Sequence, residues 1–172
     1  LTPFEEAFKR LQKLLTTLIS ENHKIETIDL GGGLGIDYSQ DIVLNISEYS
    51  KLVTKYFGNT DCNIIFEPGR RIVGNAGILI AQVICVKPGI EKQFVVLDAA
   101  MNDLLRPSLY GAIHEIIPIT RNQQKSPEVL ADIVGPICET GDTFATGVKI
   151  ANISEGDLVA INSAGAYGAV MS

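Results

Sequence analysis

The first stretch of the chain carries apolar residues at helical spacing. They recur on one face between Phe4 and Leu18, which predicts an amphipathic helix packed on a sheet. A start signal precedes them, because Thr2 suits the N-cap, Pro3 suits the first turn, and Glu5 stands where a capping box needs it. We therefore expect a helix near the start of the chain, capped by Thr2.

Two short apolar runs further along indicate strands. The first, at 24–30, leads into three glycines, and the second, at 62–66, ends in the polar loop 67–70. The second run is continuously apolar, as in parallel strands buried on both faces. A helix is predicted between them, over 46–57. This order of strand, loop and helix is that of an α/β barrel or a doubly wound sheet, in which the site lies at the C-terminal ends of the strands.

From about residue 77 onward, strand-like segments separated by turn residues replace the α/β pattern. These segments span 78–89, 92–100, 114–120, 128–142 and 156–168. They lack a long helical period and predict an antiparallel β-domain. We accordingly divide the chain into residues 1–78, an α/β part, and residues 79–172, a β-domain truncated at its C-terminal end. The polar stretch 121–129 is expected to be a variable loop.

Composition narrows the classes of partner. A net charge of −6 argues against nucleic acid, because such binding rests on Lys and Arg that neutralise phosphates. The chain shows neither an apolar run of membrane-spanning length nor a signal peptide, so we expect a cytoplasmic protein. The three cysteines are far apart, which is typical of reduced thiols rather than of disulfide frameworks or zinc sites. We predict no metal site, and we expect Cys62 and Cys85 to lie in the core.

Three consecutive glycines, Gly31, Gly32 and Gly33, follow the first predicted strand. Two interpretations are open: a tight turn, or a nest of backbone N–H groups that converge on a phosphate. The spacing is not that of a dinucleotide-binding loop, and no Walker lysine follows. If the loop binds a phosphate, a compact one such as that of a cofactor fits better than a nucleotide.

The next strand ends in Glu67, Pro68, Gly69 and Arg70. Pro68 and Gly69 turn the chain away, so that a carboxylate and a guanidinium stand beside each other. They can form a simple ion pair. Alternatively, the carboxylate can keep a ring nitrogen protonated while the guanidinium binds an oxyanion. A phosphate loop and such a carboxylate at neighbouring strand ends are what pyridoxal phosphate requires of its protein.

Five motifs, in chain order, give the sequence a family resemblance. They are "IDLGGGLG", "FEPGRRIVGNAG", "LDAAMNDLLRPSLYGAIHEI", "DIVGPICETGD" and "AGAYGAVMS". From about Ile25 to Ser172 the chain resembles the fold-type III pyridoxal-phosphate-dependent decarboxylases. This resemblance implies the C-terminal half of an alanine-racemase-like α/β barrel followed by the β-domain. It also implies a homodimer with shared active sites, and it is strongest to members that convert meso-diaminopimelate to L-lysine. The alternatives are a related basic amino-acid or carboxynorspermidine decarboxylase and a non-catalytic binding homologue.

The resemblance also implies roles for individual residues. Those expected to bind the cofactor are Gly31, Gly32, Gly33, Glu67, Pro68, Gly69, Arg70 and Tyr167. Those expected to bind the substrate are Arg70, Arg106, Tyr110, Glu139 and Tyr167. Cys138 is similar to the family's proton donor, and Thr140 stands where the family has serine.

The substrate assignment has chemical support. Diaminopimelate carries an amino-acid group at each end, so its far end needs both a cation and an anion as partners, and Arg106 and Glu139 supply them. The lysine that carries the cofactor in this family lies upstream of Leu1, and none of the lysines present matches it. We therefore expect this segment alone to be inactive. His23 and His114 are interpreted as structural.

Overall fold

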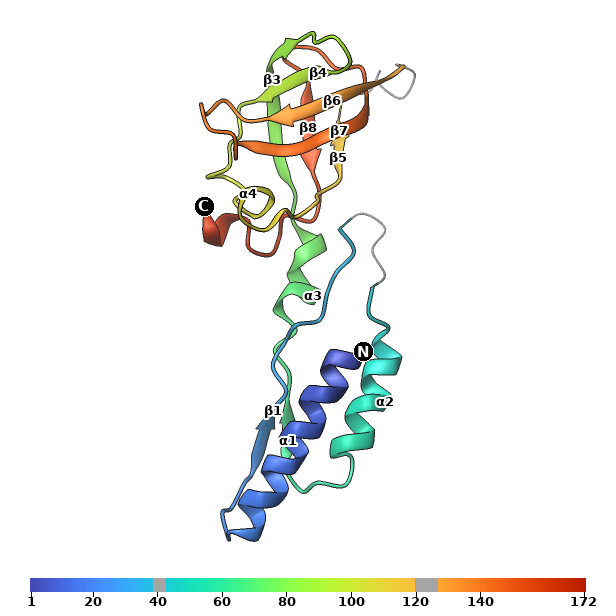
Figure 1. Ribbon diagram of the computed structural model, residues 1–172, viewed down its shortest axis with the longest axis vertical. Coiled ribbons are helices and arrows are strands. Elements are labelled where there is room, and N and C mark those ends of the chain that lie inside the picture. Colours follow the sequence, from blue (N-terminus) through green and yellow to red (C-terminus); the bar gives the residue numbers. More distant parts are fainter. Residues whose placement is uncertain (39–42, 120–126) are drawn as a thin grey trace. The chain divides into compact units, whose positions relative to one another are not determined.

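The computed structural model describes residues 1–38, 43–119 and 127–172. The chain divides into two compact units (Figure 1). Among the described residues, unit 1 comprises 1–36 and 43–69, and unit 2 comprises 37–38, 70–119 and 127–172. No helix within these ranges is long and apolar enough to cross a lipid bilayer.

Unit 1 has two helices and two parallel strands. They are α1 (Thr2–Ser20), β1 (Thr27–Asp29), α2 (Ile46–Phe57) and β2 (Asn63–Ile65). The strands pair in parallel with Ile28 opposite Ile64. Their buried core consists of Phe8, Leu15, Ile28, Leu34, Tyr49 and Phe57. These elements confirm both predicted helices and both predicted strands, with the strands shorter than the apolar runs. The predicted burial of β2 is wrong in this structure, because Ile65 is 46% exposed.

The start of α1 differs from the sequence expectation. Leu1 is the N-cap and Thr2 is already helical, without a capping hydrogen bond from a side chain, so the capping role of Thr2 is wrong. The Glu5 carboxylate instead accepts hydrogen bonds from Lys55 Nζ at 2.8 Å and Tyr56 Oη at 2.9 Å, both on α2. These bonds lower the pKa of Glu5. Glu5 is therefore used to join the two helices.

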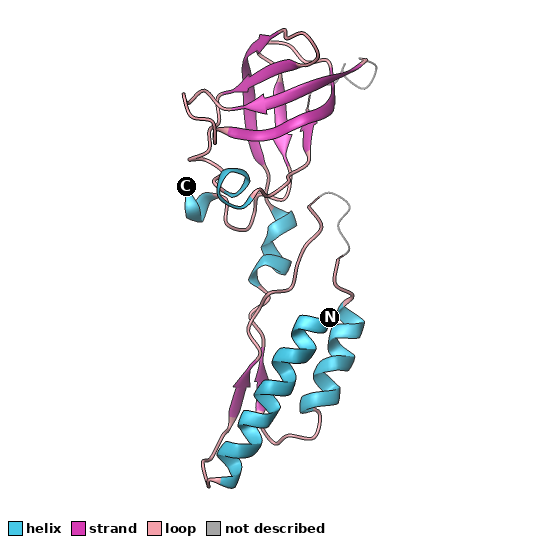
Figure 2. Ribbon diagram, viewed as in Figure 1, coloured by secondary structure: helices cyan, strands magenta, loops and turns pink. Residues whose placement is uncertain are grey.

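Unit 2 contains a six-stranded sheet with short helices near one end of it (Figure 2). Its helical turns are α3 (Gly69–Val73), η1 (Gly74–Ala76), α4 (Arg106–Tyr110) and η3 (Ala169–Met171). Its strands are β3 (Leu79–Lys87), β4 (Gln93–Leu97), β5 (Ile116–Pro118), β6 (Glu128–Val134), β7 (Thr143–Ala151) and β8 (Leu158–Ile161). The strand order is β5-β8-β3-β4-β6-β7.

The sheet is mixed, which corrects the expectation of a purely antiparallel domain. β4 and β6 pair in parallel with Val95 opposite Ile133, whereas the other pairs of this sheet are antiparallel. A parallel pair needs a long crossover, and here α4 and β5 lie on the connection. The strand β7 and the helix α4 were not predicted. The expected polar loop at 121–129 falls mostly outside the described residues.

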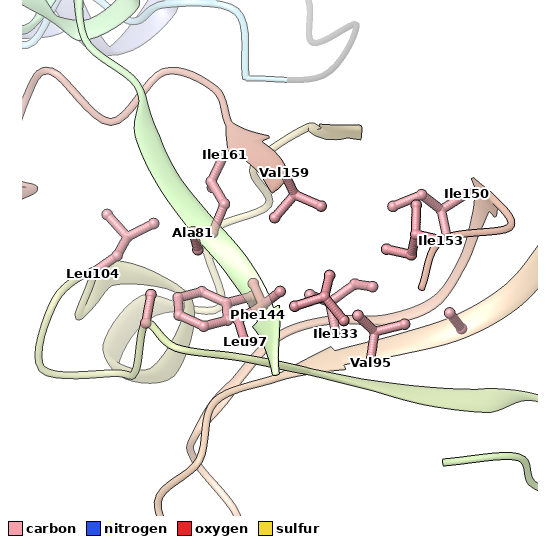
Figure 3. Close-up of a cluster of buried hydrophobic side chains, with 13 residues drawn as sticks. Ala81, Val95, Leu97, Leu104, Ile133, Phe144, Ile150, Ile153, Val159 and Ile161 are labelled. Carbon is pink, nitrogen blue, oxygen red and sulfur yellow. The ribbon is translucent and has the colours of Figure 1, made fainter. Parts of the chain in front are cut away.

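A cluster of buried hydrophobic side chains forms the core of unit 2 (Figure 3). Its fully enclosed side chains include Val95, Ile133 and Ile161, one from each of three strands. Leu104 joins this core with 1% of its surface exposed. Because Leu104 stands two residues before α4, its burial fixes the start of that short helix to the sheet.

Candidate functional site

The glycine loop of unit 1 lies directly beside Glu67. The ladder between β1 and β2 continues past the strands, because Leu30 N–H donates to the Ile65 carbonyl at 3.0 Å and Glu67 N–H donates to the Gly31 carbonyl at 2.9 Å. The Asp29 carboxylate accepts the Gly31 N–H at 2.8 Å. The structure thus brings the glycine run next to the backbone of Glu67, the residue whose carboxylate the sequence assigned to the same cofactor.

Bare backbone is required at the three glycines for two different reasons. Gly31 and Gly33 have φ of +67° and +80°, which residues with a Cβ rarely adopt. At Gly32 a Cβ would collide with the carbonyl oxygen of Glu67. This close backbone packing and the left-handed angles form a turn with no side chains of its own, as a phosphate cradle needs.

Two arginines of unit 2 converge on one cavity. The guanidinium carbon of Arg106 lies 5.5 Å from the ring centre of Tyr110 and 5.3 Å from that of Tyr167, and Arg70 lies 5.4 Å from Tyr167. With Met171 these side chains line a cavity of about 390 Å³. The Nε atoms of both arginines are buried without a hydrogen-bond partner in the described protein. Such a pair of guanidinium groups is suited to an anionic ligand.

A short backbone crossing holds Tyr167 over the arginines. Ala164 N–H donates to the Gly77 carbonyl at 2.9 Å, and Gly165 N–H donates to the Gly74 carbonyl at 3.0 Å. Tyr167 itself is in the left-handed region, with φ of 60°. The loop after β8 is therefore tied to η1, just beyond Arg70, and this fixes where the tyrosine ring stands.

Tyr38 is a neighbour of Arg106 that sequence reasoning missed. Its ring centre lies 5.6 Å from the Arg106 guanidinium carbon, and its edge meets the His114 ring at 5.2 Å between centroids. His114 is 3% exposed, and its Nδ1 lies 2.8 Å from the Asn162 carbonyl. Burial lowers the pKa of His114, and Arg106 adds to this against the effect of the Asn162 bond. The only sequence signal for Tyr38 was an aromatic residue just after the glycine loop.

The segment that carries Cys138 and Glu139 is a tight turn between β6 and β7. Both residues are exposed, and the Glu139 carboxylate accepts the Gly141 N–H at 3.3 Å. The Ser108 hydroxyl, on α4, donates to the Gly141 carbonyl at 2.6 Å. The turn with the thiol is therefore bonded to the helix that carries Arg106.

The described residues thus present three chemical groupings and no cluster for a metal. No group of three or more His, Cys, Asp or Glu side chains within 1–38, 43–119 and 127–172 is arranged to hold a metal ion. Unit 1 offers a turn of three glycines bonded to the backbone of Glu67. Unit 2 offers two guanidinium groups at one cavity and, on a neighbouring turn, a thiol beside a carboxylate.

Comparison with known proteins gives consistent matches over this chain. A family model described as "Pyridoxal-dependent decarboxylase, C-terminal sheet domain" matches residues 17–165. The chain is 47% identical to the diaminopimelate decarboxylase of Zymomonas mobilis and 44% identical to that of Aquifex aeolicus, in each case over 100% of this chain and 41% of the relative. The crystal structure of diaminopimelate decarboxylase from Helicobacter pylori complexed with L-lysine is 39% identical, with a TM-score of 0.91 over 99% of this chain and 42% of that one. The chain spans about two fifths of the length of the curated relatives it matches.

Proposed function

The chain belongs to the pyridoxal-dependent decarboxylases, and from this membership we propose that the full-length protein decarboxylates meso-diaminopimelate to L-lysine and carbon dioxide. The observation that carries the proposal is identity of 39–47% over the whole chain to relatives named for this reaction. We propose that residues 1–78 are the C-terminal part of the cofactor-binding barrel and residues 79–172 the β-domain.

The residues of unit 1 fit pyridoxal phosphate. The turn at Gly31 to Gly33 has no side chains, which would let a phosphate approach its backbone, and Gly32 packs on the Glu67 carbonyl. Glu67 would face the ring nitrogen, with Pro68 and Gly69 beside the ring. When bound, the cofactor supplies a protonated ring that withdraws electrons from the substrate's α-carbon. The negative charge of Glu67 would keep that ring nitrogen protonated.

Arg106 is proposed to bind the distal carboxylate of the substrate, with Tyr110 and Tyr167 against it. Its Nε is buried and has no hydrogen-bond partner among residues 1–38, 43–119 and 127–172, and a buried unpaired donor is costly until an acceptor arrives. Glu139 would take the distal ammonium. Arg70 would bind either the cofactor phosphate or the substrate carboxylate.

Cys138 is proposed to be the general acid. After carbon dioxide leaves, the α-carbon needs a proton, and the Cys138 Sγ would donate it from the turn between β6 and β7. A thiol on an exposed turn can approach a substrate held on a different surface, which a core residue cannot.

The active site is proposed to be shared between two copies of the chain in a cytoplasmic homodimer. The family resemblance implies that Cys138 and Glu139 of one chain complete the site built on Gly31 to Gly33 and Glu67 of the other. Two-fold symmetry then gives two equivalent composite sites. To test this, a full-length Cys138→Ala chain is mixed with a full-length chain lacking the cofactor lysine. Activity should return, because each mixed dimer holds one site with both intact halves. No recovery after verified subunit exchange would place Cys138 in its own chain's site.

The substrate proposal is tested with the full-length enzyme and carboxyl-labelled amino acids. Released carbon dioxide is measured for meso-diaminopimelate, L-ornithine and L-arginine. We expect diaminopimelate to be preferred by at least about 100-fold in kcat/KM, because only it offers Arg106 a distal carboxylate. Equal turnover of L-ornithine or L-arginine would refute the assignment. No turnover of any of them would favour a non-catalytic homologue.

A further inference from the structure

We propose that Asp142 is a positioning residue for the active site, an inference that rests on the proposed function. Its carboxylate fixes the turn with Cys138 and Glu139 to the segment that leads into α4. The proton donor proposed for the partner's site and the segment that leads to the Arg106 guanidinium are thereby held by one buried side chain. No role was assigned to Asp142 from the sequence.

The Asp142 carboxylate is hydrogen-bonded to two segments of the chain. Its side chain is 2% exposed. Oδ1 accepts the Met101 N–H at 2.6 Å, and Oδ2 accepts the Ile137 N–H at 2.7 Å. The Asp142 carbonyl also accepts the Gly135 N–H at 2.9 Å. At Gly135 a Cβ would collide with both carboxylate oxygens, so bare backbone is needed there to admit the carboxylate.

Only a carboxylate satisfies both donors at this place. The N–H groups of Met101 and Ile137 each point at one oxygen of Asp142. An asparagine of the same shape has one acceptor and one donor, so one N–H would face an NH₂ group. A glutamate is one methylene longer and the site is enclosed. The two bonds are charge-assisted and therefore stronger than bonds between neutral groups.

The two segments that Asp142 joins are the ones that carry the proposed chemistry. Ile137 directly precedes Cys138, so its N–H bond sets the course of the turn at the thiol. Met101 begins the segment that runs through the buried Leu104 to Arg106. The Ser108 hydroxyl makes a second link between the same segments through the Gly141 carbonyl. A change in Asp142 therefore moves the thiol relative to Arg106.

The test compares Asp142→Asn with Asp132→Asn in the full-length enzyme. Asp132 is a matched control, because it is also buried and also accepts a backbone N–H, that of Gly147 at 2.8 Å, together with Lys92. Wild-type turnover of meso-diaminopimelate is measured first, and its absence would refute the proposed function. Amide hydrogen exchange of the peptide over 135–142, measured without cofactor or substrate, tests separately from catalysis whether the Asp142 hydrogen bonds hold the turn.

We expect Asp142→Asn to speed exchange at 135–142 and to lower kcat by about 10- to 100-fold, the range that small misplacements produce. Asp132→Asn should lose stability while kcat and KM stay within about twofold, as expected for a site away from the chemistry. The proposal is overturned if Asp142→Asn loosens the turn yet keeps wild-type kinetics, or if Asp132→Asn lowers kcat equally. Should Asp142→Asn not fold, Ser108→Ala removes the second link, along with a weak contact to Met101 Sδ at 3.8 Å, and leaves the Asp142 bonds in place. It should lower kcat by about 2- to 5-fold, and unchanged kinetics would overturn the proposal.

Discussion

Replacing Gly32 by alanine is the most direct test of the proposed cofactor-binding turn. The new methyl group would overlap the carbonyl oxygen of Glu67. That oxygen cannot simply withdraw, because the Glu67 N–H is bonded to the Gly31 carbonyl at 2.9 Å. Overpacking of this kind costs about 1–3 kcal/mol, and loss of the backbone bond adds about 1 kcal/mol. We expect Gly32→Ala to lower the free energy of unfolding by about 2–4 kcal/mol.

The matched control is Gly35→Ala, three residues further on. A Cβ at Gly35 meets nothing within 4 Å, and its φ is not in the left-handed region. This substitution should be neutral or stabilise by a few tenths of a kcal/mol, since alanine reduces the entropy of the unfolded chain. Gly32→Ala and Gly35→Ala thus make the same chemical change in the same loop, and opposite effects on stability are expected from them.

The assay is urea unfolding of the full-length apoenzyme, followed by circular dichroism, together with absorbance titration of pyridoxal phosphate. Because the methyl group also displaces Glu67, Gly32→Ala should weaken cofactor binding by at least about tenfold, the equivalent of one charged hydrogen bond. If both variants unfold alike and bind the cofactor alike, the close approach of Gly32 to Glu67 is not a feature of the protein.

The remaining predictions concern single side chains. Arg106→Ala should raise KM for diaminopimelate by about 100-fold or more through loss of a buried charge partner. The control Arg71→Ala, at an exposed neighbour of Arg70, should leave KM unchanged. An equal KM in the two variants would show that Arg106 is not in the site. Glu67→Gln should still bind cofactor but slow decarboxylation, and turnover within about twofold of wild type would reject the ring-nitrogen role. Burial lowers the pKa of His114 below its ordinary value of 6.5, so the His114 side chain binds a proton more readily in the unfolded chain than in the folded one. The contribution of neutral His114 to stability is therefore present above pH 6.5 and lost as the pH falls below it. His114→Gln should flatten the loss of stability on acidification below pH 6.5, and an unchanged slope would contradict this.

The predictable part of the fold was the part encoded by local periodicity. The helix over 46–57 matches α2 residue for residue, because an apolar stripe and a capping asparagine are both visible in sequence. The parallel pairing of β4 with β6 depends on where a long connection returns, which no local pattern encodes. β7 was missed because its residues, "TFATGVKIA", include a glycine and a lysine and show only irregular burial.

The candidate site divides in the same way. Residues that form motifs, such as Glu67 and Arg106, stand out because their types recur at fixed positions in a family. The residues that support them do not. Tyr38 acquires a role only when its ring lies at 5.6 Å from Arg106. Asp142 was part of a recognised motif, yet its function depends on an N–H group 41 positions earlier in the chain.

The link through Asp142 gives the shared-site proposal a consequence of its own. Tyr167 contacts both Arg70 and Arg106, so these arginines are proposed to serve one site, whereas Cys138 is proposed to serve the partner's. In this proposal one chain contributes to two sites. Asp142 joins the turn that carries Cys138 to the segment that leads to Arg106.

In a mixed dimer, a Cys138→Ala chain should remove one site and leave half the activity, because symmetry makes the sites equal. An Asp142→Asn chain disturbs its own arginine cluster and the thiol that it supplies to the other site. Mixed dimers purified with two affinity tags should therefore retain less than half of the wild-type turnover. Retention of half would show that the two contributions of one chain move independently.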